Sequence, residues 1–442
     1  MIKFPKIDKI SDKFGECFRP EILRISREII EKERKKAIKG EKFLNESEIF
    51  DEISREYENF KNLELKSLIN ATGIVIHTNF GRSVISPEIL DRAGKNLENY
   101  TNLEYDQNIG KRGNRYDYTA KLFSLLFDAP DALVVNNNAA AVFLVLNTFC
   151  KNKECVVSRG ELVEIGGSFR IPEVMANSGA ILHEIGTTNK TKLQDYENAI
   201  CENTALLMKV HRSNFAISGF TGDVYMNEIS KLAKKRGLID YFDIGSGFVY
   251  DLNFNLTKDE PKISDLLRAG VSLISFSGDK LFGGVQAGII LGSHELISKL
   301  RKNQLLRMLR VDKITLSLLA ETIKAYINKE FELIPTVSMI NESEQNLRKN
   351  AEIVAHILSE NKISFEICKT ETFVGGGSLA CRTYPSVAIA FGGIKPEILE
   401  EKFRKNGVIG RIENEKFLLD FRSIFKKDLK ILANKILDIF HE

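Results

Sequence analysis

The chain lacks paired cysteines and long apolar runs. Its six cysteines are scattered with no C-x-x-C pair: Cys17, Cys150, Cys155, Cys201, Cys368 and Cys381. This spacing argues against a zinc ribbon, a thioredoxin motif and a disulfide framework, and it predicts reduced, mostly buried thiols. No stretch of about 18 uninterrupted apolar residues occurs, and residues 1–10 lack the apolar core of a signal peptide. We therefore expect a cytoplasmic protein with no membrane partner and no metal site.

A strong excess of one charge is also lacking. The 442 residues carry a net charge of +3, and 43% are apolar and 28% charged, as is ordinary for globular proteins. So small an excess does not by itself indicate a nucleic-acid partner, and it does not exclude a local basic surface. The chain is too long for one simple core, so two or three domains are expected.

Residues 1–62 lack the β-branched runs that occur later in the chain. Residues 21–39 and 45–60 carry apolar side chains at helical spacing, which predicts a small helical N-terminal domain. The first helix bears a basic run that consists of Lys32, Arg34, Lys35, Lys36 and Lys39. From charge alone, this run is either a solvated face or a surface that binds nucleic acid.

Residues 63–310 alternate β-branched runs with amphipathic segments. Strands are predicted at 132–135, 154–157, 205–210, 238–243, 273–276 and 288–291, and helices between them, for example at 139–149 and 226–236. Strands that alternate with helices predict a mostly parallel, doubly wound sheet, whose ligands bind in the loops after the strands. Residues 311–442 are predicted to form a bridging helix, which begins after a break near Val311, and a small C-terminal α/β domain.

Lys280 follows the apolar run 271–276 and enters a turn that continues into glycines. An amine placed in this way can form a Schiff base with an aldehyde cofactor, and pyridoxal phosphate (PLP) is the common one. A lone lysine in such a loop is more often simply solvated. Ser277, three residues earlier, can reach the phosphate of the same cofactor.

Two further strand ends support this interpretation. Asp243 ends an earlier strand, where a buried carboxylate can pair with a protonated pyridine nitrogen, although strand-end aspartates are also common in turns. Asn137, Asn138 and Ala139 begin a helix after another strand, where free N–H groups can hold a phosphate, although an ordinary helix cap has the same pattern. Together, in this order, the features predict the fold type I of PLP-dependent transferases, which is aspartate aminotransferase-like.

Several longer motifs resemble those of the bacterial selenocysteine synthase family, the L-seryl-tRNA(Sec) selenium transferases. They are INATGIVIHTNFGR (69–82), VNNNAAAV (135–142), SRGELVEIGGSFRIP (158–172), EIGTTNKT (184–191), KVHRSNF (209–215) and FSGDK (276–280). The resemblance runs from roughly residue 60 to residue 310. It implies an enzyme that converts L-seryl-tRNA(Sec) to L-selenocysteinyl-tRNA(Sec) through a PLP-bound aminoacrylyl intermediate, with selenophosphate as the selenium donor.

The resemblance also implies roles for single residues. Lys280 would remove the Cα proton, with Asp279 and Asn214 at the same active site. The selenophosphate anion would be bound by Arg82, Arg307 and Arg310, and the last two are predicted to share a helix face. The helical domain would bind tRNA through its basic run, and the chain would assemble as a decamer built of dimers. His77 and His211 are left without a role, and no ring-stacking residue is identified.

Two alternatives remain open from the sequence. A related PLP-dependent lyase that acts on a small amino acid or an amino-sugar phosphate would keep Lys280, Asp243 and the arginines, but it would not need residues 1–62. A protein that only binds tRNA or PLP would not need the pair of Lys280 and Asp243. The presence of both features favours the tRNA-dependent enzyme.

Overall fold

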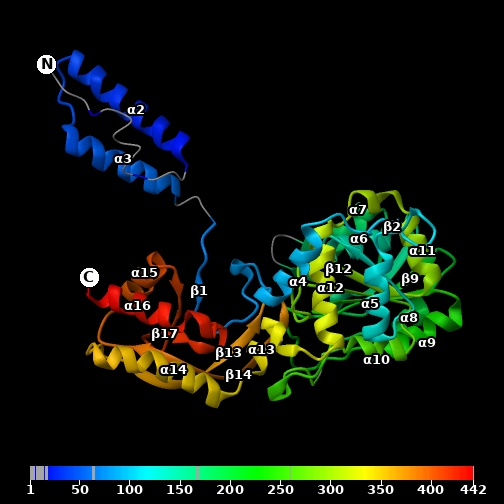
Figure 1. The fold of residues 1–442 in the computed structure, drawn as a ribbon. Coiled ribbons are helices and arrows are strands. Elements are labelled where there is room, and N and C mark those ends of the chain that lie inside the picture. The colour runs from blue at the N-terminus through cyan, green and yellow to red at the C-terminus, as the bar shows by residue number, and fades with distance from the viewer. Residues whose placement is uncertain are drawn as a thin grey trace. The chain divides into compact units, whose positions relative to one another are not determined.

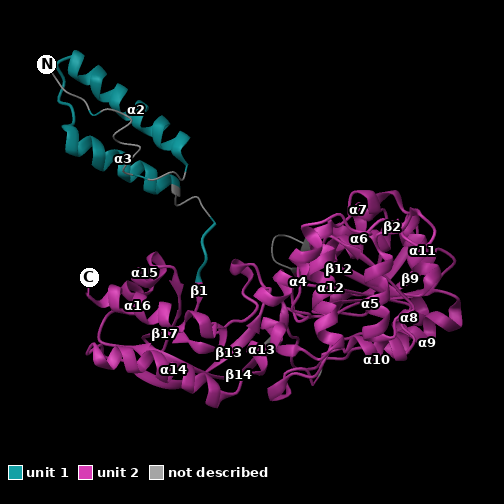
Figure 2. Cartoon of the chain, viewed as in Figure 1, with its two compact units in different colours: residues 1–68 teal, residues 69–442 magenta. Residues whose placement is uncertain are grey.

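The computed structural model describes residues 5, 14, 18–61, 65–165, 169–258 and 260–441. Its contacts divide the chain into two compact units, residues 1–68 and residues 69–442 (Figure 2). The sequence predicts a first boundary at residue 62, and residues 62–64 lie outside the described part. The residues that the sequence assigns to two further domains form one unit here.

The first unit is a helical hairpin, as predicted. It contains α2 (Arg19–Ile38) and α3 (Glu46–Lys61) (Figure 1). Before α3, the Asn45 side chain accepts a hydrogen bond from the Glu48 N–H at 3.1 Å, and the Glu48 carboxylate accepts one from the Asn45 N–H at 2.7 Å. These reciprocal bonds satisfy donors that a helix start leaves free. The two helices share a core of Ile22, Ile25, Ile30, Ile49, Ile53 and Tyr57.

A seven-stranded sheet forms the centre of the second unit. Its order is β4 (Asp131–Val135), β12 (Gly288–Gly292), β11 (Leu273–Ser277), β10 (Ile239–Gly245), β9 (Thr204–Val210), β5 (Glu154–Ser158) and β8 (Ile181–Ile185). Only β12 runs antiparallel to its neighbours. Three of these strands, β4, β11 and β12, are buried along their whole length, which explains their continuous apolar runs. The prediction of a mostly parallel α/β sheet is confirmed.

Helices surround this sheet (Figure 1). Their bounds are α4 (Pro87–Leu97), α5 (Asp117–Phe127), α6 (Asn138–Phe149), α7 (Ile171–Ser178), α8 (Leu193–Ala199), α9 (Met226–Arg236), α10 (Ile263–Arg268), α11 (His294–Lys302) and α12 (Lys313–Ile327). Short strands lie outside the sheet as two hairpins, β2 (Tyr105–Asp106) with β3 (Lys111–Arg112) and β6 (Glu164–Ile165) with β7 (Phe169–Arg170). Among the described residues, no helix is both long and apolar enough to cross a membrane.

The predicted break in the helical stretch before α12 is confirmed. Asp312 caps α12 by accepting hydrogen bonds from the N–H groups of Ile314 and Thr315 at 2.7 and 2.9 Å. The prediction that Arg307 and Arg310 share one helix face is wrong. Arg307 ends a short 3-10 helix, whereas Arg310 forms an antiparallel β-bridge with Val135. The extended backbone beside β4 replaces the helix that the spacing suggested.

The C-terminal part of the second unit contains a four-stranded antiparallel sheet, in the order β13 (Glu366–Gly375), β14 (Ser378–Phe391), β17 (Lys416–Asp420) and β16 (Arg411–Glu413). Four helices accompany it: α13 (Pro335–Asn341), α14 (Glu344–Glu360), α15 (Pro396–Lys405) and α16 (Leu429–His441). In addition, β1 (Ile69–Asn70) pairs in parallel with β15 (Val408–Ile409), and Thr72 pairs with Asp420. The start of the second unit therefore packs against its C-terminal sheet.

The cysteines agree only in part with their predicted burial. Cys150 and Cys155 are buried free thiols, Cys368 is half-buried and Cys201 is exposed. Cys17 lies outside the described residues, and the side chain of Cys381 is not described. Burial is thus seen for two of the four described thiols.

Candidate active site

The site lies where the strands of the large sheet end. Asp243 belongs to β10 and pairs in register with Val210 of β9 and with Ser275 of β11. Lys280 follows β11 by three residues, and Asn138 begins α6 directly after β4. The carboxyl ends of parallel strands meet at one edge of a sheet, which is where such folds bind ligands.

Asp243 is a buried carboxylate that is held by neutral donors. It is 4% exposed and accepts a hydrogen bond from Asn138 Nδ2 at 2.7 Å. Burial raises the pKa of the Asp243 carboxyl, while the Asn138 bond and the positive charge of Lys280 act in the opposite direction. The Asn138 Oδ1 atom is buried and has no hydrogen-bond partner in the described protein. The pair of Asp243 and Asn138 is suited to a cationic ring nitrogen, which would stabilise the ionised Asp243 carboxylate.

Lys280 is a buried amine with space beside it. Its side chain is 6% exposed, and burial lowers its pKa, with the charge of Arg82 acting in the same direction. A Cβ atom added to Gly245 would lie 3.8 Å from Lys280 Nζ, and one added to Gly377 would lie 3.4 Å from it. Two glycines from distant parts of the chain therefore leave room around the amine.

The lowered pKa of Lys280 gives a pH prediction. Only the neutral amine attacks an aldehyde, so covalent attachment of PLP to the apoprotein should become faster as pH rises through the Lys280 pKa and then level off. Because the pKa is depressed, this plateau should be reached below pH 10.5, the ordinary lysine value. Stopped-flow absorbance at about 420 nm measures the rate. A rate that still increases up to pH 10.5 would contradict the buried environment of the amine.

Asp279 is held on both carboxylate oxygens. Ser277 Oγ donates to Asp279 Oδ1 at 2.7 Å, and Arg82 Nη1 donates to Asp279 Oδ2 at 2.8 Å. The Arg82 backbone has a φ of 65°, which is uncommon for a residue with a side chain. Thus Arg82 and Ser277, predicted to bind anionic groups of ligands, are joined through Asp279 in this structure.

The start of α6 has the features of a phosphate site. Asn137 is its N-cap, and its side chain accepts a hydrogen bond from the Ala140 N–H at 2.8 Å. The N–H groups of Asn138 and Ala139 belong to the first turn, where a helix supplies no internal acceptors. The helix cap is therefore observed, and the phosphate site stays a prediction, because a capped helix can still offer two N–H groups to a phosphate.

Asn214 follows β9 and lies next to the same space. Its Nδ2 atom donates to the Glu164 carbonyl at 3.1 Å, while its Oδ1 atom is buried without a partner among the described residues. A Cβ atom added to Gly377 would lie 3.7 Å from the Asn214 Cβ. Asn214, Gly377 and Lys280 are therefore neighbours.

Arg307 and Arg310 line a different cleft of about 400 Å³, and Arg82 is not among its lining residues. Other cations contribute to this cleft, namely Arg112, Arg115, Arg301 and Lys302. The Glu104 carboxylate lies 2.6 Å from Arg115 and 3.8 Å from Arg310. The excess of guanidinium groups suits an anion. Among the described residues, no ion pair or hydrogen bond joins Arg82 to Arg307 or Arg310.

The two histidines left without a role differ in their surroundings. The His211 ring atom Nε2 lies 3.0 Å from Glu260 Oε2. The backbone N–H of His211 donates to the backbone carbonyl of Asp243 at 2.8 Å. His77 stacks on Phe80 with ring centroids 4.0 Å apart, and burial lowers its pKa. His211 thus supports the strand end that carries Asp243.

The family follows from comparison with known proteins. The model of the L-seryl-tRNA selenium transferase family matches residues 68–425. The chain belongs to this family. It is 54% identical to L-seryl-tRNA(Sec) selenium transferase of Campylobacter fetus subsp. fetus over 432 residues, which are 97% of this chain and 96% of the relative. It is 51% identical to that of Aliarcobacter butzleri over 441 residues, 99% and 98% of the two chains.

A solved structure shows the same fold. D-Glucosaminate-6-phosphate ammonia-lyase matches with a TM-score of 0.61 at 17% sequence identity, covering 86% of this chain and 97% of the lyase. The sheet of this selenium transferase family member, with β12 as its single antiparallel strand, is that of the PLP-dependent fold type I. The predicted fold class is therefore confirmed, and PLP is its cofactor.

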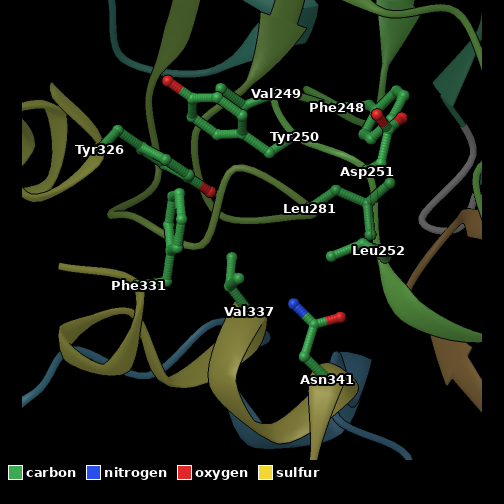
Figure 3. A pocket seen from close by; sticks show the side chains of 10 residues that line it. All are labelled: Phe248, Val249, Tyr250, Asp251, Leu252, Leu281, Tyr326, Phe331, Val337 and Asn341. Carbon is green, nitrogen blue, oxygen red and sulfur yellow. The ribbon is translucent and has the colours of Figure 1, made fainter. Parts of the chain in front are cut away.

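The residues of the site fit this cofactor. The unpartnered Asn138 Oδ1, the acid Asp243 and the buried amine of Lys280 converge on one edge of the sheet, and the first turn of α6 is placed for the phosphate. By contrast, a pocket of about 60 Å³ is lined by Leu281 and by aromatic side chains that include Phe248, Tyr250, Tyr326 and Phe331 (Figure 3). This aromatic pocket is too small for PLP, so it is part of the packing and not the cofactor site.

The basic run of the first unit lies on α2 among acidic side chains. Lys35 pairs with Glu31 at 3.2 Å, and Lys36 pairs with the buried Glu33 at 2.7 Å. Lys32 and Lys39 border the same surface, and no ion pair is recorded for either among the described residues. Two lysines of the run are thus partly neutralised, while Lys32 and Lys39 remain available to an anion.

Sequence reasoning missed three residues of this region. Glu260, which contacts His211, lies in a loop that gives no motif signal. Gly377 and Ser378 belong to a Gly-Gly-Gly-Ser run that is far from Lys280 in the sequence. That run was the available signal, because consecutive glycines indicate a turn or a close approach.

Proposed function

We propose that this chain converts L-seryl-tRNA(Sec) to L-selenocysteinyl-tRNA(Sec) with selenophosphate as the selenium donor. The observation that carries this proposal is a buried Lys280 amine and a buried Asp243 carboxylate at one edge of the sheet, where the charge of each shifts the pKa of the other, in a chain related along nearly its whole length to enzymes of that name. Because charged tRNA is a substrate of protein synthesis, we also propose that the enzyme acts in the cytoplasm.

The residues divide the chemistry between them. Bound PLP would supply an electron sink that acidifies Cα of an attached amino acid. Asp243 would hold the ring nitrogen in its cationic form, and Asn138 and Ala139 would bind the phosphate through their N–H groups. In its free form, the neutral Lys280 amine would take the proton from Cα of the seryl group. Asp279, fixed by Ser277 and Arg82, would stabilise the resulting ammonium charge.

The selenium donor is an anion and needs cations. We assign it to Arg82, Arg307 and Arg310, with guanidinium groups as the matching donors for its oxygens. Arg82 does not line the cleft of the other two, and we propose that a neighbouring copy of the chain completes the site. This arrangement is consistent with the decamer of dimers that we expect from the family.

The first unit would bind the body of the tRNA through α2. We expect the double variant Lys32→Ala, Lys39→Ala to weaken tRNA(Sec) binding severalfold and to lower the slope of log affinity against log salt by roughly one to two. Filter binding at several salt concentrations measures both quantities. The control is the pair Lys234→Ala, Lys235→Ala on α9, which removes the same charge from the second unit. Equal losses for the two pairs would contradict a specific role of α2.

A second candidate function is that of a PLP-dependent lyase acting on a small amino acid or an amino-sugar phosphate. It is favoured only by the structural similarity to D-glucosaminate-6-phosphate ammonia-lyase, which at 17% identity shows the fold alone. The two candidates separate in one assay. Purified protein is given seryl-tRNA(Sec), free L-serine or an amino-sugar phosphate, each with selenophosphate. Selenylated product from seryl-tRNA(Sec) alone supports the proposal, whereas turnover of a small substrate without tRNA supports the lyase.

A further inference from the structure

The turn between β13 and β14 reaches the amine of Lys280. Gly375 pairs with Ser378, so Gly376 and Gly377 form a two-residue hairpin loop, with φ values of 62° and 70°. Such loops favour positive φ at both central residues, which explains the glycines as turn residues. At Gly377 the lack of a side chain has a second effect, because a Cβ atom there would lie only 3.4 Å from Lys280 Nζ.

A hydrophobic cluster holds this turn in place. Val374 and Leu379, on either side of the turn, share a cluster with Ile76 and with Leu281, the residue after Lys280. The Ile76 N–H also donates to the Val374 carbonyl at 2.9 Å. The turn is therefore fixed against the Lys280 segment by packing, although about a hundred residues separate the two in the sequence.

Ser378 has features that turn geometry does not explain. Its side chain is 2% exposed, and its hydroxyl is buried with no hydrogen-bond partner in the described protein. A buried hydroxyl without a partner is costly, so a ligand is the natural source of the missing bond. Leu379 next to it has a φ of 54°, a strained conformation that is typical of functional sites for residues with a side chain. Asn214, near Gly377, also has a buried oxygen without a partner.

We propose that the Gly377–Ser378 turn is the part of the site that receives the seryl group of the aminoacyl ester, with Ser378 as a substrate-binding residue. Gly377 leaves the space beside the Lys280 amine that the groups on Cα need. The Ser378 hydroxyl makes a hydrogen bond to the seryl group, either to its ester carbonyl oxygen or to its β-hydroxyl. This inference rests on the proposed function, because it assumes a seryl ester as substrate.

The test measures how much the seryl group contributes to binding. The affinities of the PLP-loaded enzyme for seryl-tRNA(Sec) and uncharged tRNA(Sec), without a selenium donor, give a ratio that isolates this group. We expect Ser378→Ala to lower the ratio roughly tenfold while the affinity for uncharged tRNA(Sec) and the PLP content stay unchanged. The control, Ser359→Ala on the exposed face of α14, should leave the ratio unchanged. An equal ratio in both variants, or weaker binding of uncharged tRNA by Ser378→Ala, would overturn the inference.

Two further arms sharpen the test. Gly377→Ala should also lower the ratio while PLP is retained. The control is Gly393→Ala, which also changes a glycine with a positive φ, of 80°, but there an added Cβ would meet no atom within 4 Å. It should leave the ratio unchanged. Loss of PLP from Gly377→Ala would instead assign the turn to the cofactor and overturn the inference. With alanyl-tRNA(Sec), a bond to the ester carbonyl predicts the same loss, and a bond to the β-hydroxyl predicts none. If the unaltered enzyme binds seryl-tRNA(Sec) no more tightly than uncharged tRNA(Sec), the result would contradict the proposed function itself.

Discussion

Replacing Lys280 by alanine is expected to abolish covalent PLP binding and to slow selenium transfer by at least about 10⁴-fold. The Lys280 amine is buried and has no ion pair among the described residues, whereas Lys209, which is also buried, is already paired with Glu161 and Asp223. Lys280 is also the proposed base for Cα. Absorbance at about 420 nm and intact mass after borohydride reduction measure the covalent link. Single-turnover assays with seryl-tRNA(Sec) measure the rate.

The matched control is Lys231→Ala, which removes an exposed lysine from α9. It should keep the absorbance, the added mass and the rate of the unaltered enzyme. If Lys280→Ala keeps the band near about 420 nm, another lysine carries the cofactor and the assignment of the site is wrong. Because the Lys280 side chain makes no hydrogen bond or ion pair with the residues that the structure describes, its truncation should not prevent folding.

The second large effect is expected for Asp243→Asn. Asparagine keeps the shape and can still face Asn138, but it lacks the charge that would pair with a cationic ring nitrogen. In a buried environment this charge is worth more than in water, so the transfer rate should fall on the order of 10²–10³-fold. PLP affinity should fall about tenfold, as measured by titration of the apoprotein.

The exposed Asp251, whose side chain is 80% exposed, provides the control. Asp251→Asn should change neither the rate nor the PLP affinity. A rate for Asp243→Asn within twofold of the control would show that the carboxylate has only a structural role. Because burial already raises the pKa of Asp243 in the protein alone, such a result would mean that the acid stays protonated with the cofactor bound.

The large sheet and its site edge were predictable from the sequence because their signals are local. Six of the seven strands were predicted from mainly apolar runs, whereas β8, which contains His183 and Glu184, was not. Asp243 lies near the end of such a run, and Asn138 and Lys280 follow such runs within three residues. The helix 226–236 begins and ends at the predicted residues. Local spacing also gave the break before Asp312, whose capping side chain is visible in the sequence.

Features that depend on packing between distant segments were not predictable. The spacing of Arg307 and Arg310 suggested a helix, but pairing of Arg310 with Val135 imposes an extended backbone. Likewise, Gly377 and Ser378 reach Lys280 only because Val374, Ile76 and Leu281 share one cluster. The bond between Arg82 and Asp279 also joins residues nearly two hundred positions apart. A single sequence contains no signal for the partners in such contacts; the glycine run at 375–377 indicates a turn or a close approach but not to which segment.

The most direct test of the account follows the Cα proton of the substrate. Seryl-tRNA(Sec) with deuterium at Cα is incubated with the PLP-loaded enzyme and selenophosphate. The amino acid is then released from the tRNA and its mass is measured by mass spectrometry. The account predicts that the product is selenocysteine and that its Cα deuterium has been lost to the solvent. In Lys280→Ala, neither selenocysteine formation nor loss of deuterium should occur. Recovery of serine with its deuterium intact from the unaltered enzyme would contradict the account.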